Sequence, residues 1–293
     1  MAERGFQVSI FAKESGQQTT SGAAAAIWFP YDAEPPEKVI PWALATYEAL
    51  MDLTRDPAAG VSLIELRQLS RTGETHIPDW AAPFGVHALV ASELDACFRS
   101  GFSLRVPLMD TTVYLGYLAK RLSMAGGSMT TNAQFQKLEN VPPEFDLVIN
   151  CAGIGARELV YDADLEPHRG QVAIVPKLHN LSSAIVCDDA PLMYAIPRAN
   201  DCIFGGTNEI SDDLRVNADS TARIVEECSR VLRIPQPNVV AERVGLRPFR
   251  KSGVRLERGR LRDGRTVIHN YGHGGAGFTL SWGCAETVLS LSA

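Results

Sequence analysis

The chain lacks the features that mark several protein classes. No run of about eighteen apolar residues occurs, and the N-terminus has no apolar signal-peptide core, so we expect no membrane segment. The chain also lacks a stripe of basic residues: its formal net charge is −6 and its isoelectric point about 5.6. Because a nucleic acid needs clustered Lys and Arg to neutralise its phosphates, we expect no nucleic-acid partner. Since no apolar segment is long enough to enter a bilayer, we expect no membrane partner either.

Cysteine is scarce, and its spacing forms no motif. The six cysteines include no C-x-x-C pair, and most of them stand in apolar stretches. This disfavours a zinc site or a disulfide framework and favours buried free thiols in a reducing compartment. We therefore predict a cytoplasmic protein without a metal; the C-terminal residues L-S-L-S-A are not a peroxisomal S-K-L address. The cysteines are Cys97, Cys151, Cys187, Cys202, Cys228 and Cys284.

Internal repeats and low-complexity linkers are also missing, while strand-like and helix-like segments alternate. With 45% hydrophobic residues the chain can bury one large core or two modest ones. The alternation predicts an α/β or α+β fold, and four short strands in the middle predict a second, antiparallel sheet. The expected strands are 6–11, 61–70, 102–106, 145–153, 172–175, 184–187, 193–196 and 202–205. The expected helices are 42–53, 112–125, 219–232 and 278–291. Asp219 and Ser220 are the candidate N-cap residues of the third helix.

The most informative stretch is residues 267–285, which read V-I-H-N-Y-G-H-G-G-A-G-F-T-L-S-W-G-C-A. The stretch opens as a strand, passes through closely spaced glycines and continues as a helix. A strand followed by a glycine loop and a helix N-terminus is the arrangement that binds polar or anionic cofactor groups through main-chain N–H groups. A plain glycine-rich turn is the alternative.

Two further elements carry chemistry. The hydroxyls and N–H groups of Thr19, Thr20 and Ser21 precede an apolar, helix-like run and could surround a phosphate, although a plain helix N-cap explains them equally well. Arg247 stands in the apolar context V-G-L-R-P-F-R. A guanidinium in such a setting needs an anionic partner, which is either a substrate carboxylate or a structural ion pair.

Together these elements resemble the D-amino-acid oxidase family of flavoenzymes. The similarity runs from about Gly5 to Leu291 and is carried by the T-T-S element, the G-L-R-P element and the run 268–285. It implies a Rossmann-like FAD-binding domain with an interleaved antiparallel-sheet substrate domain. We expect the FAD-binding domain at 1–50, 110–165 and 264–293, and the substrate-binding domain at 51–109 and 166–263.

The resemblance also implies roles for individual residues. Arg247 and Tyr194 would bind the substrate carboxylate, the Gly275 carbonyl would accept from the substrate amine, and Phe29 would lie beside the substrate side chain. No acid–base residue is expected, because hydride passes directly from the substrate to the flavin. We expect backbone carbonyls to satisfy His269 and His273. The implied FAD-binding residues are Thr19, Thr20, Ser21, Ala25, Ala26, Ile27, Phe135, Gly274, Gly277, Phe278 and Thr279.

The chain departs from the family pattern at two places. Ala190 stands where members often have a second tyrosine. Residues 1–5 resemble the end of the family's first helix, so the preceding strand and G-x-G-x-x-G turn are absent, and we expect weak FAD binding.

The resemblance implies oxidative deamination of a D-amino acid with FAD, while O2 is reduced to hydrogen peroxide. Because Phe29 approaches the substrate side chain with no nearby cation in the sequence, we expect neutral substrates; an arginine from elsewhere, such as Arg198, would change this. A homodimer is the candidate assembly. The alternatives are a glycine or sarcosine oxidase and a truncated, non-catalytic remnant with weak FAD binding.

Overall fold

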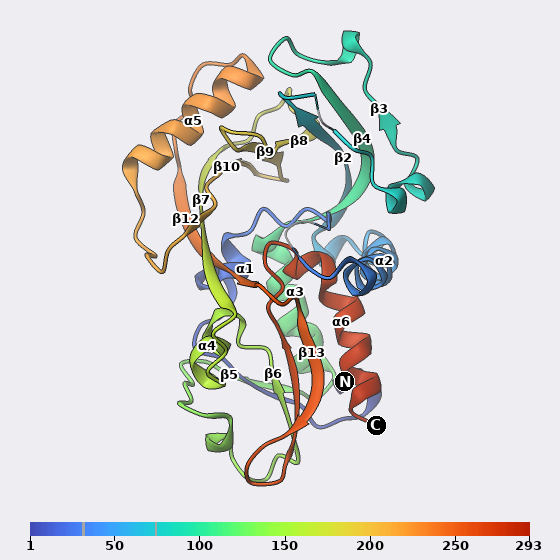
Figure 1. The fold of residues 1–293 in the computed structure, drawn as a ribbon, viewed down its shortest axis with the longest axis vertical. Coiled ribbons are helices and arrows are strands. Elements are labelled where there is room, and N and C mark those ends of the chain that lie inside the picture. The colour runs from blue at the N-terminus through green and yellow to red at the C-terminus, as the bar shows by residue number, and fades with distance from the viewer. Residues whose placement is uncertain (31–32, 74) are drawn as a thin grey trace.

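The computed structural model describes residues 1–30, 33–73 and 75–293 (Figure 1). Within these residues the strands form sheets of nine, three and two strands. Figure 1 shows the nine-stranded sheet in the upper half and most of the helices, with the smaller sheets, in the lower half. The two termini lie close together at the lower right of this view.

The nine-stranded sheet is antiparallel except where β2 and β8 pair in parallel. Its central order is β7-β10-β9-β8-β2-β4, and β12 pairs with β7 along ten residues. This meander confirms the predicted antiparallel sheet. Its strands are β2 (Val61–Ser70), β3 (His87–Ala88), β4 (Ser100–Met109), β7 (Leu165–Pro176), β8 (Ser183–Cys187), β9 (Met193–Pro197), β10 (Asp201–Gly205), β11 (Glu209–Ile210) and β12 (Ala241–Arg250).

The two smaller sheets contain the parallel pairs expected of a dinucleotide-binding fold. In the two-stranded sheet β1 (Ser9–Phe11) pairs in parallel with β5 (Ser128–Thr130). In the three-stranded sheet β14 (Thr266–Tyr271) pairs in parallel with β6 (Leu147–Asn150) and antiparallel with β13 (Arg255–Arg260). β13 falls in the range 166–263 expected for the substrate domain, and the domain boundaries stay a prediction.

The long helices pack on these sheets through their apolar faces. The α5 residues Ile224, Val225, Cys228 and Val231 are buried against the nine-stranded sheet, as their spacing predicts. In the lower half α2 lies against α6, where a Cβ at Gly283 would overlap the backbone of Trp42. The helices are α1 (Thr20–Ala23), α2 (Pro36–Leu53), α3 (Thr111–Met124), α4 (Ala156–Leu159), α5 (Ala218–Leu232) and α6 (Gly277–Leu291). Short 3₁₀ turns are Ala2–Arg4, Gly16–Gln18, Pro57–Ala59, Asp79–Phe84, Ala91–Glu93, Leu138–Asn140 and Gly153–Gly155.

The start of α5 differs from its prediction for a clear reason. The N-cap of α5 is Asn217, whose side-chain oxygen accepts a hydrogen bond from the N–H of Ser220 at 2.9 Å. The prediction of Asp219 and Ser220 as caps was therefore wrong: both lie inside the helix. Asn is as good an N-cap residue as Asp or Ser, so composition alone could not choose among them.

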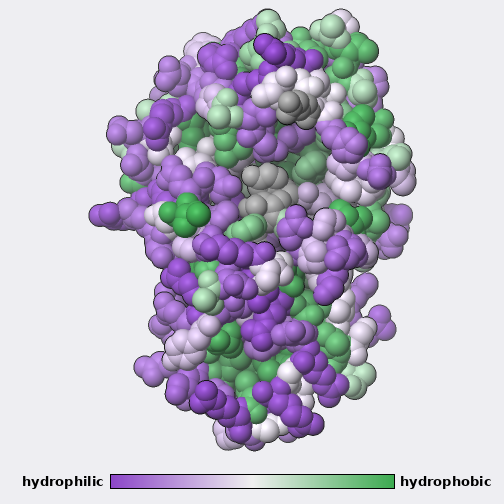
Figure 2. All heavy atoms as spheres, in the orientation of Figure 1, coloured by the Kyte–Doolittle hydropathy of each residue, from purple (hydrophilic) through white to green (hydrophobic). Residues whose placement is uncertain are grey.

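On the face seen in Figure 2, hydrophilic residues predominate and apolar residues form small, separate groups. No helix in the described part of the chain is long and apolar enough to cross a membrane. All six cysteines are free, and four of them are buried.

Candidate cofactor and substrate site

A cavity of about 2560 Å³ lies between the large sheet and the elements of the lower half. It is lined by the glycine loop before α6, the segment around α1, the ends of β1 and β6, and one face of the nine-stranded sheet. Small-molecule sites typically occupy roughly 300–1,000 Å³, so this cavity is large enough for a cofactor and a substrate together. Every site residue predicted from the sequence lines it.

The glycine loop connects β14 to α6. Gly272 and Gly274 have positive φ angles of 85° and 52°, which glycine adopts without strain. The Gly274 N–H donates to the carbonyl of Pro248 at 2.9 Å, so the loop is fixed beside Arg247 on β12. Gly275 and Gly277 are exposed to the cavity, and a Cβ at Gly277 would meet no atom within 4 Å.

The N-terminus of α6 opens toward this space. The first helical hydrogen bond is made by the N–H of Leu280 to the carbonyl of Ala276 at 3.0 Å. The N–H groups of Gly277, Phe278 and Thr279 precede it and have no partner within the helix. Such groups bind oxygen or nitrogen acceptors and stabilise negative charge through the helix dipole.

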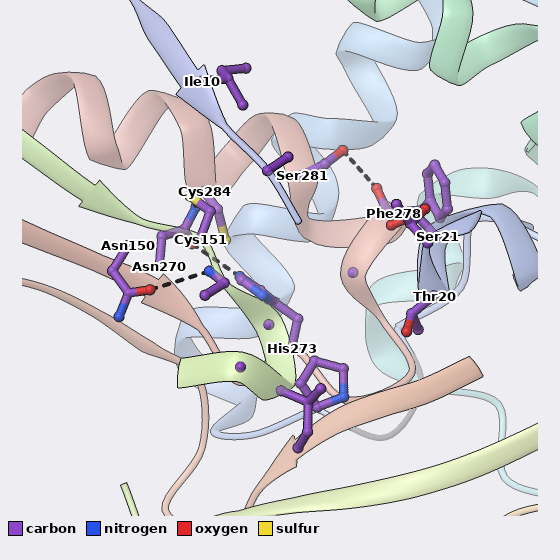
Figure 3. Close-up of a pocket in the computed structure, with 18 of the residues that line it drawn as sticks. Ile10, Thr20, Ser21, Asn150, Cys151, Asn270, His273, Phe278, Ser281 and Cys284 are labelled. Carbon is purple, nitrogen blue, oxygen red and sulfur yellow. Dashed lines mark hydrogen bonds between the residues drawn. The ribbon is translucent and has the colours of Figure 1, made fainter. Parts of the chain in front are cut away.

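The hydroxyls of the T-T-S element have different partners. Thr19 Oγ1 accepts from the N–H of Gly22 at 3.0 Å and donates to the Gly16 carbonyl, so Thr19 is the N-cap of α1. Thr20 Oγ1 lies between the N–H and carbonyl of Leu246 and connects α1 to β12. Ser21 is exposed and lines the cavity, and Figure 3 shows Thr20 and Ser21 beside Phe278.

Small residues and aromatic rings line the remainder of the predicted cofactor surface. Ala25, Ala26 and Ile27 continue from α1 along the cavity wall, and Ile27 bridges to Leu108 of β4. At the end of β1 the Phe135 ring packs edge-on against Phe11, with centroids 5.5 Å apart. Glu14, the acidic residue that follows β1, also lines the cavity there, and acidic residues at such strand ends bind ribose hydroxyls in dinucleotide folds.

Arg247 is a half-buried cation without a carboxylate partner in the described residues. Its Nη1 donates to the carbonyl of Thr207 at 3.1 Å, and its guanidinium lies close enough to the Tyr194 hydroxyl to lower the pKa of that group. The structural ion pair considered from the sequence is not formed among these residues. The positive charge is therefore available to an anion that enters the cavity.

Two glycines make room for Arg247 and Tyr194. A Cβ at Gly170 of β7 would lie 2.5 Å from Nη1 of Arg247, and a Cβ at Gly205 of β10 would overlap the Tyr194 ring. The Arg247 guanidinium thus packs directly on the backbone of Gly170, and the Tyr194 ring packs on that of Gly205. Burial raises the pKa of the Tyr194 hydroxyl, and the Arg247 charge opposes that rise, so Tyr194 stays a neutral hydrogen-bond donor.

Phe29 and Thr279 are linked to each other. The Thr279 hydroxyl donates to the Phe29 carbonyl at 3.0 Å and accepts from the Phe29 N–H at 3.1 Å. This pair fixes the N-terminus of α6 against the segment that follows α1, while the Phe29 ring packs against Trp80. Thr279 therefore contributes to the site through its main chain.

The two histidines of the glycine region are neutral. Burial, with the Arg255 charge as a smaller cause for His269, lowers the pKa of both imidazoles to about 4. Their neighbours are side-chain amides, since His269 Nδ1 lies 3.4 Å from Asn150 Nδ2 and His273 Nε2 lies 3.0 Å from Asn270 Oδ1. The expected backbone carbonyl partners are not the ones observed. Figure 3 shows His273 below Asn270 and Cys151 in the pocket.

Arg169 and Gln171 hold the loop after β10 in place. Arg169, 4% exposed, donates to the carbonyls of Asp213 and Arg215 and to the Gln171 side chain. The Gln171 N–H donates to the Thr207 hydroxyl at 2.9 Å. Because the Thr207 carbonyl accepts from Arg247, this network also fixes the position of the guanidinium.

Comparison with known proteins agrees with this geometry. The fold and the cavity define a flavin-dependent oxidoreductase, and a family model described as FAD dependent oxidoreductase matches residues 1–291. The D-amino-acid oxidases of Rubrobacter xylanophilus and Streptomyces coelicolor are 39% and 38% identical to the chain. Those matches cover all of this chain and 90% and 91% of the relatives. The chain therefore belongs to the FAD-dependent oxidoreductase family, and the resemblance drawn from its sequence is confirmed.

More distant matches agree on the fold. The D-aspartate oxidase of Homo sapiens is 30% identical, over 97% of this chain and 86% of the relative. Among solved structures, glycine oxidase from Geobacillus kaustophilus superposes with a TM-score of 0.80 at 18% identity, over 99% of this chain and 89% of that one. L-proline dehydrogenase from P. horikoshii also gives a TM-score of 0.80, at 13% identity, over 100% of this chain and 88% of that one. At these identities the structural matches show the fold alone.

The residues present fit FAD as the cofactor. The cavity is lined by the helix N-terminus of α6, the exposed Ser21, the small residues after α1 and the Phe135 ring. A flat ring system needs glycine and alanine for close approach, and phosphate or carbonyl oxygens need N–H donors. The assignment of individual residues to parts of FAD stays a prediction.

Proposed function

We propose that the protein is a D-amino-acid oxidase, which oxidises a neutral D-amino acid to an imino acid while O2 is reduced to H2O2. The observation that carries this proposal is Arg247, a cation without a carboxylate partner in the described residues, held with Tyr194 beside the glycine loop. An amino-acid carboxylate would complete this pair through two charge-assisted hydrogen bonds.

The residues of the chain would bind and orient the substrate. Arg247 and Tyr194 would fix its carboxylate, and the Gly275 carbonyl, in the loop held against β12, would accept a hydrogen bond from its amino group. Three fixed contacts around one carbon distinguish the two enantiomers, because only one hand then points its hydrogen into the cofactor space. FAD, when bound, supplies the acceptor for the hydride of the substrate Cα and passes both electrons to O2.

Proton balance needs no charged base in this site. The ammonium group of the free substrate gives one proton to water; the neutral amine then loses its Cα hydrogen as hydride and becomes an iminium, which water hydrolyses to a 2-oxo acid and ammonium. His269 and His273, with pKa values of about 4, are neutral and are held by side-chain amides. Their role is to hold the strand and loop, and the rate comes from positioning.

A preference for neutral over acidic substrates follows from where the cations lie. Arg198, the residue that would bind a second carboxylate, is only 6% exposed and donates to both oxygens of Asp201 at 2.7 Å. It does not line the cavity. Lys13, Arg121 and Arg157 do line it, but each is paired with a carboxylate, so a D-aspartate side chain beside Phe29 would compete for its partner.

A glycine or sarcosine oxidase is the competing activity. The relatives named D-amino-acid oxidase share up to 39% identity with this chain, whereas the glycine oxidase structure shares 18%. Sequence similarity therefore favours the D-amino-acid activity. The free cysteines are consistent with a cytoplasmic location, and a homodimer remains a prediction.

The proposal is tested by oxygen consumption with purified protein reconstituted with FAD. We expect hydrogen peroxide from D-alanine, D-leucine and D-methionine, slower turnover of D-aspartate, and none from the L-enantiomers. Turnover of sarcosine or glycine alone would assign the protein to the competing activity. Equal rates with D- and L-leucine would contradict the three-contact arrangement.

A further inference from the structure

A continuous row of residues crosses the large sheet beneath the cavity. Strand register pairs Gly205 with both Val172 and Tyr194, Val186 with Tyr194, and Gln68 with Val186. All of these except Gly205 line the cavity. The Arg247 guanidinium lies over Gly170 of β7, and the strand order β7-β10-β9-β8 places β8 three spacings of about 4.8 Å, about 14 Å in all, from it.

A carboxylate lies at the Gln68 end of this row. Asp188 follows β8 directly and is two residues beyond Val186, which puts it on the same face of the sheet. It is exposed and lines the cavity, and its Oδ2 accepts a hydrogen bond from Gln68 Nε2 at 2.8 Å. No Lys, Arg or His of the described chain makes an ion pair with it.

The surroundings of Asp188 disfavour an unpaired negative charge. Although the residue is exposed to the cavity, the surrounding protein desolvates its carboxyl and raises the pKa; the neighbouring Asp189 raises it further, and the Gln68 amide only partly opposes this. Asp189 differs because Ser70 Oγ and the Arg71 N–H both donate to its Oδ2. A cation that entered the cavity would thus meet Asp188, a carboxylate that can still accept hydrogen bonds.

Arg247 on β12 and Asp188 after β8 therefore line one cavity and carry opposite charges. Tyr194 and Val186, which pair in register, line the cavity on the strands between them. In D-lysine the carboxylate carbon and the ammonium nitrogen are separated by six bonds, about 7 Å in the extended form. With a hydrogen bond of about 2.8 Å at each end, such a molecule reaches about 13 Å, close to the three strand spacings.

We propose that Asp188, positioned by Gln68, binds the cationic end of long basic side chains and so extends the substrate range to D-lysine and D-arginine. The inference rests on the proposed function, because it assumes that the substrate carboxylate binds Arg247. Short neutral substrates do not reach Asp188 and do not depend on it. An acidic side chain is disfavoured for two reasons: it finds no unpaired cation beside Phe29 among the described residues, and the Asp188 carboxylate repels it.

The test compares D-lysine with D-norleucine, which has the same carbon chain and no ammonium group. For the FAD-loaded wild type and Asp188→Asn, we expect the ratio of kcat/KM for D-lysine to that for D-norleucine to fall about tenfold or more in the variant. The fall should come from KM, since the ammonium group lies far from the reacting carbon. Glu65→Gln is the matched control: Glu65 is an exposed carboxylate of β2 that does not line the cavity, so the ratio should stay at its wild-type value.

A charge-reversing variant makes the test independent of any loss of fold. Asp188→Lys should reverse the preference and favour D-2-aminoadipate, a carboxylate of similar length, over D-lysine. An unchanged D-lysine to D-norleucine ratio in Asp188→Asn would overturn the inference while D-norleucine turnover upheld the proposed function. Failure of the wild type to oxidise either compound would instead contradict the proposed function, and the inference with it.

Discussion

A single methyl group added at Gly170 is predicted to weaken substrate binding without contacting the substrate. In Gly170→Ala the new Cβ would lie 2.5 Å from Arg247 Nη1 and 2.6 Å from Cζ and Nη2. Because ordinary carbon contacts begin at about 3.5 Å, the guanidinium must move by about 1 Å. It ends a flexible side chain, so it can move while the backbone of β7 stays in place.

The size of the effect follows from this displacement. A misplacement of about 1 Å in a positioning group costs roughly a hundredfold in rate. We expect kcat/KM for D-alanine or D-leucine to fall about a hundredfold in Gly170→Ala, with the melting temperature and the absorbance spectrum of bound flavin unchanged. The same fall is expected in the affinity of a carboxylate inhibitor such as benzoate, measured by titration of the flavin spectrum.

The matched control is Gly116→Ala in α3. A Cβ there meets no atom within 4 Å, and the helical position favours alanine, so activity should be unchanged and stability should rise by about 0.5–1 kcal/mol. Wild-type kcat/KM in Gly170→Ala would refute the reasoning, because it would show that the guanidinium does not need its observed position.

Three further predictions follow from the same geometry. Arg247→Met removes two charge-assisted hydrogen bonds worth about 3 kcal/mol together and should raise KM about a hundredfold or more, with an intact flavin spectrum; an unchanged KM would make Arg247 structural. Gly205→Ala displaces the Tyr194 ring and should raise KM about tenfold, as Tyr194→Phe should, and steady-state kinetics on both variants checks this. Because burial holds the pKa of His269 at about 4, protonation favours the unfolded chain, so stability should fall as pH drops from about 6.5 to 4, by at most about 3 kcal/mol. His269→Asn should flatten that slope in urea unfolding, and an equal slope in both proteins would assign the loss to other groups.

The parts of the site that sequence could predict are those that depend on the backbone. The glycines between the strand and the helix determine the backbone course of the 272–277 loop independently of its neighbours. β14 and α6 accordingly lie at the residues that the sequence pattern predicts. Alternation likewise places β2 at the predicted residues 61–70. These features are local, so a short stretch of sequence determines them.

The parts that sequence could not predict depend on contacts between distant segments. Thr279 and Phe29 are 250 residues apart, and no local pattern shows that their hydrogen bonds take up the Thr279 hydroxyl. In the sequence Gly170 is an ordinary strand residue. Its importance appears only in the structure, where the pairing of β12 with β7 places the Arg247 guanidinium over it. Asp188 and Gln68 are 120 residues apart and meet only through the parallel pairing of β8 with β2.

The most direct test of the account is reduction of the bound flavin in the absence of oxygen. FAD-loaded protein is mixed anaerobically with D-leucine or L-leucine, and the absorbance of the oxidised flavin is followed in time. We predict complete bleaching by the D-enantiomer, with no bleaching by the L-enantiomer and a rate reduced about a hundredfold in Arg247→Met at subsaturating substrate. Bleaching by both enantiomers at similar rates, or by neither, would contradict the claim that Arg247, Tyr194 and Gly275 orient a D-amino acid toward the flavin.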